Sequence, residues 1–239
     1  MERLPILLLP GMDGTGILFR SFRGALPPEV AAVCEDLSQE RPQDHRTLAA
    51  AVHPPDVPYA VLGESFSGPL ALLLADRDPN ARAVVLAASF SRCPSRLLSL
   101  LWPLARAPLF VPRLPDSVVR RYLMGEDAGP LDLSAFRLAN RFVDPHAMSA
   151  RLRAIAQVDV DAELARCKVP VLYLRAKRDR AVGRQESERM RRVCPSMEIE
   201  DVDAPHLLLQ RAPEECARRI DAFLRRHGVI APSAAAPAS

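Results

Sequence analysis

The stretch VPYAVLGESFSGPLALLLA, residues 57–75, has the pattern of a buried strand, followed by a serine-containing corner and then by a helix. Its first part is rich in aliphatic and β-branched residues, and its last part is a leucine-rich run long enough for a helix. Glycine, serine and proline stand between the two parts, so the chain must reverse its direction within a few residues. The stretch predicts a β-strand that turns sharply into an α-helix.

The corner residue of this turn is either Ser65 or Ser67. A strand that reverses directly into a helix strains its corner residue and brings the residues two before and two after it close together, so both must be small. With Ser65 at the corner these are Gly63 and Ser67, whereas with Ser67 at the corner one of them is Pro69. A proline ring does not suit that crowded position, but it is tolerated in the first turn of a helix. Pro69 therefore favours Ser65 as the corner.

Short aliphatic runs alternate with helical stretches over most of the chain, which is typical of a parallel sheet wrapped by helices. The predicted strands are residues 4–10, 30–37, 57–65, 81–90, 168–179 and 197–203. The predicted helices are residues 19–26, 44–52, 67–77, 184–194 and 213–228. We therefore expect an α/β fold with a mostly parallel sheet of about six strands and helices on both faces.

The alternation stops between residues 93 and 160, where the sequence predicts short helices broken by prolines. We expect a core formed by residues 1–92 and 161–230, with residues 93–160 as a small helical insertion after the fourth strand. The proline- and alanine-rich tail, residues 231–239, has nothing to pack against and is expected to be disordered.

The first half of this insertion is both apolar and basic. Between Arg92 and Arg121 the chain has six arginines and one aspartate, although its overall formal net charge is only +3. Leu101, Trp102 and Phe110 are expected to line a binding site for a hydrophobic group. The alternative is that they only pack the insertion onto the core. The charge favours an anionic amphiphile such as a fatty-acyl thioester, or transient contact with an anionic membrane. A solvated arginine face is the competing interpretation.

The composition of the 239 residues excludes several classes of protein. The charge is too small to indicate a nucleic-acid partner, and no phosphate-binding glycine motif is present. The first apolar run is too short for a signal peptide or a membrane span, so a cytoplasmic protein without stable membrane insertion is expected. The cysteines lack metal-ligand spacing and are expected to be reduced and mostly buried, with no metal or other cofactor. They are Cys34, Cys93, Cys167, Cys194 and Cys216.

Candidate catalytic residues follow the predicted strands, because ligands of open parallel sheets bind at the carboxyl ends of the strands. Ser65, Asp179 and His206 occur at such ends, in that order along the chain. Taken singly, each residue also has a structural interpretation. Ser65 could stand in an ordinary turn, Asp179 in a solvated ion pair, and His206 in a loop with no catalytic role. The remaining histidines are isolated and are expected at the surface or in loops. They are His45, His53, His146 and His227.

The GES corner, the segment RAKRD and the segment DAPHLLLQ together resemble the α/β-hydrolase family, over residues 4–228. The resemblance implies that Ser65 is a nucleophile, that His206 is its general base and that Asp179 holds and stabilises the imidazole. Asp201 and Asp203 lie near His206 in the sequence and are the alternative acids.

The loop LPGMDGTG, residues 9–16, follows the first predicted strand and completes the resemblance. It implies an oxyanion hole made by the backbone N–H groups of Met12 and of Phe66, the residue after the nucleophile. The family more often has histidine-glycine where this chain has Pro10-Gly11, which keeps the backbone donor but removes a side chain that often supports the loop.

The resemblance implies a serine hydrolase that cleaves a small-molecule carboxylic ester or thioester, with a hydrophobic acyl group, through an acyl-enzyme. It also implies that residues 93–160 form a small helical cap over the nucleophile. The same catalytic residues would also serve an acyltransferase, a C–C bond hydrolase or a lactonase. The loop LPGMDGTG is also similar to that of plant phytyl ester synthases, which implies acyl transfer to a lipid alcohol. A non-catalytic ligand-binding member of the fold is the remaining alternative. The sequence predicts no oligomeric state.

Overall fold

The computed structural model describes residues 4–40, 42–94 and 114–230, which form a six-stranded, all-parallel sheet with the strand order β2-β1-β3-β4-β5-β6. The strands are β1 (Leu4–Leu9), β2 (Val30–Cys34), β3 (Tyr59–Glu64), β4 (Ala81–Ala87), β5 (Val171–Ala176) and β6 (Glu198–Val202). Each lies inside a predicted strand, so the predicted fold class is confirmed.

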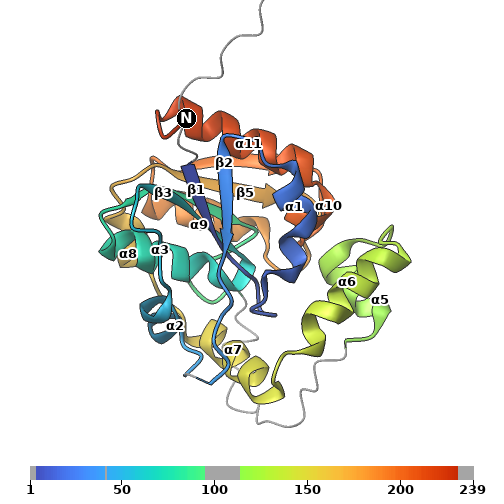
Figure 1. Cartoon of the computed structure of the whole chain (residues 1–239). Coiled ribbons are helices and arrows are strands. Elements are labelled where there is room, and N and C mark those ends of the chain that lie inside the picture. The colour runs from blue at the N-terminus through green and yellow to red at the C-terminus, as the bar shows by residue number, and fades with distance from the viewer. Residues whose placement is uncertain (1–3, 41, 95–113, 231–239) are drawn as a thin grey trace, which may run out of the picture.

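Helices cover both faces of this sheet (Figure 1). The helices of the described residues are α1 (Arg20–Ala25), α2 (His45–Ala51), α3 (Gly68–Arg77), α5 (Asp116–Val119), α6 (Pro130–Arg141), α7 (Pro145–Gln157), α8 (Asp161–Ala165), α9 (Arg184–Val193), α10 (Leu208–Arg211) and α11 (Pro213–Arg226). Short 3-10 helices, η1 (Gly16–Phe19) and η2 (Ser65–Ser67), and a π-helical turn, η4 (Arg120–Met124), complete the set.

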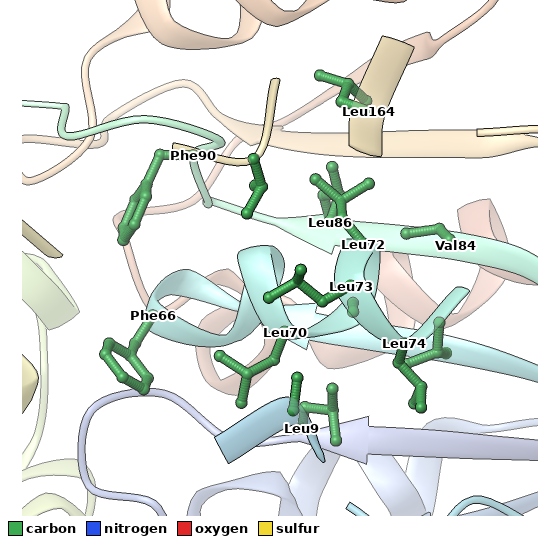
Figure 2. Packing of buried hydrophobic residues seen from close by; sticks show 14 of the residues in the cluster. Leu9, Phe66, Leu70, Leu72, Leu73, Leu74, Val84, Leu86, Phe90 and Leu164 are labelled. Carbon is green, nitrogen blue, oxygen red and sulfur yellow. The ribbon is translucent and has the colours of Figure 1, made fainter. Parts of the chain in front are cut away.

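Two apolar clusters form the core, one on each face of the sheet. Figure 2 shows part of the first cluster, in which Leu70 and Leu74 of α3 lie near Leu9 of β1. In the second, Phe22 of α1 and Phe223 of α11 are fully buried against the opposite face. Burial on both faces explains why these strands read as continuous apolar runs rather than as alternating ones.

The strand order reverses beside β1. The chain passes from β1 outward to β2, and it then returns to the other side of β1 to form β3. Leu9 and Gly63 are paired neighbours near the ends of β1 and β3, so the loops that follow these strands start side by side. A reversal of this kind opens a crevice at the carboxyl ends of the strands, where ligands bind in open α/β sheets.

The two ends of the segment 93–160 lie next to each other. Arg92 forms an isolated antiparallel bridge with Asp159, and the Val160 N–H donates to the Ser91 carbonyl across 2.9 Å. The chain therefore leaves and rejoins the sheet region at one place.

The helices of this segment differ from their prediction. α6 and α7 are 12 and 13 residues long, and their prolines, Pro130 and Pro145, stand at their first positions, where a proline begins a helix rather than breaks it. Figure 1 shows both helices on the side toward which β1 and β2 point. Leu101, Trp102, Phe110 and the tail lie outside the described residues.

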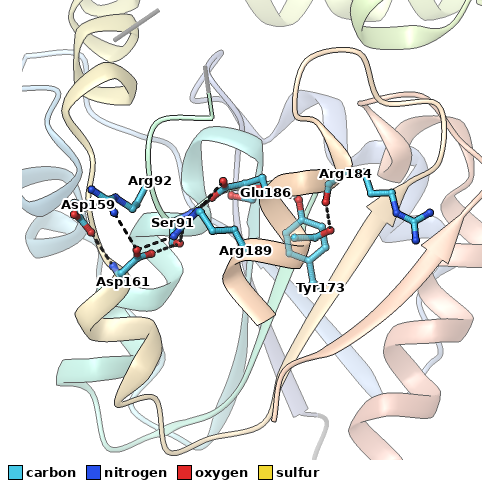
Figure 3. A network of polar contacts seen from close by, with 10 residues as sticks. Ser91, Arg92, Asp159, Asp161, Tyr173, Arg184, Glu186 and Arg189 are labelled. Carbon is cyan, nitrogen blue, oxygen red and sulfur yellow. Dashed lines mark hydrogen bonds and ion pairs between the residues drawn. The ribbon is translucent and has the colours of Figure 1, made fainter. Parts of the chain in front are cut away.

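A charged network fixes the place where this segment begins (Figure 3). The Ser91 hydroxyl donates to Asp161 across 2.6 Å, and Arg189 of α9 bonds to Asp161 and to Glu186 at 2.7 and 2.6 Å. The network joins the end of β4 to α8 and α9. Because its charges are paired and hydrogen-bonded, it is compatible with partial burial.

The five cysteines are free thiols, as expected. Only Cys194 and Cys216 are buried, so the expectation of mostly buried thiols was wrong for Cys34, Cys93 and Cys167, which are half-buried. Within the described ranges, no helix has the length and apolar character needed to cross a bilayer. The same residues hold no group of three or more potential metal ligands.

Candidate active site

Ser65 occupies the corner between β3 and η2 with a φ of 48°, in the left-handed region that residues other than glycine seldom adopt. The crowding predicted for this turn is present. A Cβ atom on Gly63 would lie 2.7 Å from the carbonyl carbon of Ser67 and 2.8 Å from the Cα of Gly68. Only glycine fits at position 63, and the turn presents Ser65 above the end of the sheet.

Ser67 and Gly68 serve different purposes in the same turn. The Ser67 hydroxyl is fully buried and donates to the carbonyl oxygen of Pro10, in the loop after β1. A Cβ on Gly68 would lie 2.6 Å from the Cβ of Ser89, so glycine here makes room for that serine. The serine that departs from the usual glycine thus ties the corner to the neighbouring loop.

The three sequence-predicted residues Ser65, His206 and Asp179 lie in one hydrogen-bonded line. Ser65 Oγ is 2.9 Å from His206 Nε2, and His206 Nδ1 is 2.8 Å from Asp179 Oδ2. The other carboxylate oxygen of Asp179 accepts from the N–H groups of Ala181 and Val182, both at 2.8 Å. With neutral imidazole, Nδ1–H donates to the carboxylate and Nε2 accepts from the serine hydroxyl.

The surroundings of His206 act on its pKa in opposite directions. Burial lowers the pKa of the imidazole, but the charge of Asp179 and its hydrogen bond raise it, with a smaller contribution from Glu64, and the net result is a raised pKa. An imidazole in this environment is well suited to take up a proton when one becomes available.

The two alternative acids lie elsewhere. Asp201 is held by Arg175 at 2.5 and 3.0 Å, and Asp203 by Arg178 at 3.0 Å. Both are therefore engaged in ion pairs with arginines, and it is the Asp179 carboxylate that contacts His206.

The N–H groups of Met12 and Phe66 each belong to a peptide group whose carbonyl oxygen accepts a hydrogen bond. The Gly11 carbonyl, which shares a peptide plane with the Met12 N–H, accepts from the Gly14 N–H at 3.0 Å. The Ser65 carbonyl, which shares a plane with the Phe66 N–H, accepts from the Ser89 hydroxyl at 2.6 Å. Because C=O and N–H point in opposite directions in a trans peptide, these bonds fix where both N–H groups point.

Two residues near this site were missed at the sequence level. Ser89, in the segment SFSR, was assigned no role, although it follows β4 and so stands at a strand end like the other candidates. His45 was expected at the surface or in a loop, but it is buried and stacks on Phe66, with ring centroids 4.4 Å apart. Its Nε2 lies 3.1 Å from the Phe66 carbonyl and must carry the proton, because a carbonyl only accepts. Burial lowers the pKa of His45 to about 4, which keeps it neutral.

Glu64 precedes the corner serine and is 1% exposed. Its Oε2 accepts a long hydrogen bond from Gln210, 3.3 Å, and its Oε1 is buried without a hydrogen-bond partner among the described residues. Burial raises the pKa of Glu64 to about 7, and the nearby Asp13 adds to the shift. Both effects favour the protonated carboxylic acid beside the site.

The segment 93–160 reaches the loop that carries His206. The Leu207 N–H donates to the Leu123 carbonyl at 2.9 Å, and Leu207 packs in an apolar cluster with Val119 and Leu133. Val119 also lines a cavity of about 1060 Å³ between α5 and α6, where its neighbours include Phe136. The lining is mixed, because Asp116, Arg137, Asn140 and Arg141 stand beside the apolar side chains, and Val119 is the residue that it shares with the apolar cluster of Leu207.

Similarity to known proteins bears on the family and on the fold. The model of the alpha/beta hydrolase family matches residues 6–219 of the chain. No curated protein sequence matches. Similar solved structures include an esterase from Exiguobacterium antarcticum, with a TM-score of 0.81 and 16% identity over 94% of this chain and 92% of that one.

Two further structures have slightly lower TM-scores. A lipase-esterase related protein from Clostridium acetobutylicum has a TM-score of 0.77 and 19% identity over 93% of this chain and 95% of that one. The enol-lactonase from Burkholderia xenovorans has a TM-score of 0.75 and 16% identity over 94% of this chain and 92% of that one. At these identities the likeness concerns the fold, while the family match covers most of the sequence. The chain belongs to the alpha/beta hydrolase family.

Proposed function

We propose that this protein is a serine hydrolase that cleaves a carboxylic ester or thioester through a covalent acyl-enzyme. The observation that carries the proposal is the continuous line of contacts from Ser65 Oγ through His206 to Asp179, at 2.9 and 2.8 Å. Nucleophile, base and orienting acid within hydrogen-bond reach of one another are the requirement for this chemistry. Membership of the hydrolase family supports it independently.

In the first half of the reaction, Ser65 Oγ attacks the acyl carbonyl carbon and its proton passes to His206 Nε2. The carbonyl oxygen becomes an oxyanion that accepts from the backbone N–H groups of Met12 and Phe66. Asp179 stabilises the imidazolium. When the tetrahedral intermediate collapses, the C–O or C–S bond breaks and His206 returns the proton to the leaving alcohol or thiol.

In the second half, His206 Nε2 takes a proton from water, and the resulting hydroxide attacks the acyl carbon. Collapse of this second intermediate releases the carboxylic acid and returns the proton to Ser65 Oγ. Atoms and charge balance with water as the only co-reactant.

The substrate that we propose has a hydrophobic acyl group. The apolar part of the cavity between α5 and α6, formed by Leu114, Val119, Phe136 and Val143, supports this proposal. The lining does not include Ser65, so the cavity would hold the end of the acyl group that is remote from the reacting carbonyl. Arg141 at the same cavity is compatible with an anionic head group. We further propose that residues 93–160 act as the cap over the site and that the protein works in the cytoplasm.

Labelling by a fluorophosphonate, which reacts with activated serines, tests the proposal. We expect the wild type to be labelled and Ser65→Ala not to be labelled, with Ser67→Ala labelled as the matched control. A folded wild type that neither reacts with the probe nor cleaves 4-nitrophenyl esters of two to twelve carbons would refute the proposal and favour a ligand-binding role.

Acyl transfer by the same residues is the second candidate function. It is distinguished from hydrolysis by letting an added alcohol compete with water for the acyl-enzyme. Adding a primary or a long-chain alcohol to the reaction should leave the free acid as the main product if water is the natural acceptor. A dominant ester product at low alcohol concentration would assign the protein to acyl transfer.

A further inference from the structure

Arg151 of α7 is the largest side chain in the described part of the chain that is fully shielded from solvent, with 0% exposure. Its pKa is lowered to about 10 by burial, partly offset by the charge of Asp13, so it remains cationic at neutral pH. A buried arginine is costly unless its donors are satisfied. Its partners therefore show what the charge is used for.

Within the described residues, the hydrogen bonds that Arg151 donates all end on neutral acceptors. Nη1 donates to the Met12 carbonyl at 2.8 Å, and Nε donates to Gln43 Oε1 at 2.9 Å. Nη2 donates to the Leu37 carbonyl at 3.3 Å and makes a longer contact of 3.5 Å with the Ser38 carbonyl. One guanidinium thus joins α7 to the loop after β1 and to the loop after β2.

The same guanidinium packs directly on the turn that contains Met12. A Cβ on Gly14 would lie 2.8 Å from the guanidinium carbon, so the glycine leaves the space that Arg151 fills. Gly14 has a φ of 69°, and its N–H anchors the Gly11 carbonyl. Arg151 therefore contacts this short turn at two residues, Met12 through a hydrogen bond and Gly14 through packing.

We infer that Arg151 is a positioning residue for the proposed hydrolase, which holds the turn of residues 11–14 so that the Met12 N–H is directed at the oxyanion. The inference rests on the proposed function. Arg151 would then support this loop in a chain that has Pro10 where the family more often has a histidine. The supporting side chain comes from a helix 139 residues later in the sequence.

The main test compares Arg151→Met and Arg151→Lys with Arg189→Met. Arg189 is an equally well-bonded arginine, but it binds Glu186 and Asp161 and does not touch the turn. All variants are measured below their unfolding temperatures on a 4-nitrophenyl ester that the wild type cleaves. Complete loss of an oxyanion donor costs about 10²–10³ in kcat. Because Arg151→Met displaces the donor rather than removing it, we expect kcat to fall about tenfold or more, with KM changed less than about twofold.

Inhibitors separate positioning from a general structural role. A trifluoromethyl ketone with the same acyl chain forms an oxyanion on Ser65, whereas the corresponding methyl ketone binds mainly in the ground state. Arg151→Met should weaken binding of the trifluoromethyl ketone by the same factor by which kcat falls, and it should leave binding of the methyl ketone nearly unchanged. Arg151→Lys should have an intermediate effect. Arg189→Met should lose thermal stability but keep kcat and both affinities within about twofold.

Gly14→Ala provides a second route if Arg151→Met does not fold. Its methyl group would push against the guanidinium, and alanine is also strained at a φ of 69° in either background. We therefore expect kcat to fall in both backgrounds, and to fall less in the Arg151→Lys background, where the contact with the guanidinium is absent. The inference is overturned if Arg151 variants are folded and labelled by the fluorophosphonate but keep wild-type kcat, or if both ketones weaken equally. A wild type that is not labelled at all refutes the proposed function itself, which is a distinguishable result.

Discussion

The Ser67 hydroxyl donates a hydrogen bond to the main-chain oxygen of Pro10, which joins the turn after β3 to the loop after β1 across 57 residues of sequence. Both residues are buried, so each depends on the other for its hydrogen bond. The loop and the corner that supply the two proposed oxyanion donors are therefore linked by a side chain that the usual glycine could not provide.

Replacing Ser67 by alanine is expected to lower stability more than activity. The change leaves the Pro10 carbonyl buried without its partner, which costs about 1–3 kcal/mol. Catalysis should persist, because Ser67 does not contact the reacting atoms, and Ser67→Gly should behave in the same way. Urea unfolding measures the first effect and ester hydrolysis the second. Ser149→Ala is the control, since its buried hydroxyl has no partner among the described residues, and it should be nearly neutral.

Two glycine-to-alanine substitutions should have opposite effects. Gly63→Ala places a methyl group against the backbone of Ser67 and Gly68, which cannot move without opening the corner, so we expect little folded protein or a loss above about 3 kcal/mol. Gly24→Ala in α1 meets no atom within 4 Å and should stabilise the chain by up to about 1 kcal/mol. Thermal unfolding of both variants checks this. A Gly63→Ala protein as stable as the wild type would contradict the tight turn.

The strands and the corner were predictable from the sequence because their signals are local. Buried parallel strands are continuous apolar runs, and the position of Pro69 favours Ser65 as the corner from sterics alone. Because Asp179 and His206 also follow strands, the sequence predicted that these distant residues would lie near Ser65.

Arg151 and His45 were not predictable in this way. Arginine in an amphipathic helix is usually solvated. The hydrogen-bond acceptors of Arg151 lie more than 100 residues away in the sequence, so no local pattern predicts them. His45 begins a short helix and shows no local sign that it stacks on Phe66. Their burial is set by tertiary contacts, which a one-dimensional pattern does not contain.

Asp179→Asn should change the pH dependence of the reaction. In the wild type the pKa of His206 is raised above its ordinary 6.5, and catalysis needs the neutral imidazole, so kcat/KM should rise with pH around a midpoint above 6.5. Removing the carboxylate charge leaves burial to dominate, which shifts this midpoint downward. The rate should also fall by up to about 10⁴, because the imidazole is no longer held in the right tautomer.

Asp203→Asn is the matched control for this substitution. Asp203 is another aspartate of the same sequence region, but its side chain is 72% exposed and pairs with Arg178. Its removal should leave both the midpoint and kcat unchanged. If Asp203→Asn moved the profile and Asp179→Asn did not, the proposed acid would be the wrong one.

Glu64→Gln should alter how stability depends on pH. Burial raises the pKa of Glu64 from its ordinary 4.5 to about 7, so the folded state binds this proton more tightly than the unfolded state does. The resulting stabilisation is complete below pH 4.5 and is lost as pH rises through 7. A shift of this size corresponds to at most about 3 kcal/mol. The glutamine keeps the shape and the contact with Gln210 but does not titrate.

The difference in unfolding free energy between wild type and Glu64→Gln, measured in urea at several pH values, isolates this group from all others. We expect the wild type to lose stability relative to the variant between pH 4.5 and 8. Asp13, whose own pKa is raised mainly by burial, and His206 are the charged neighbours that act on Glu64, and both are present in each protein. A constant difference across this range would mean that Glu64 is ionised in the folded protein and that its buried oxygen has found a partner.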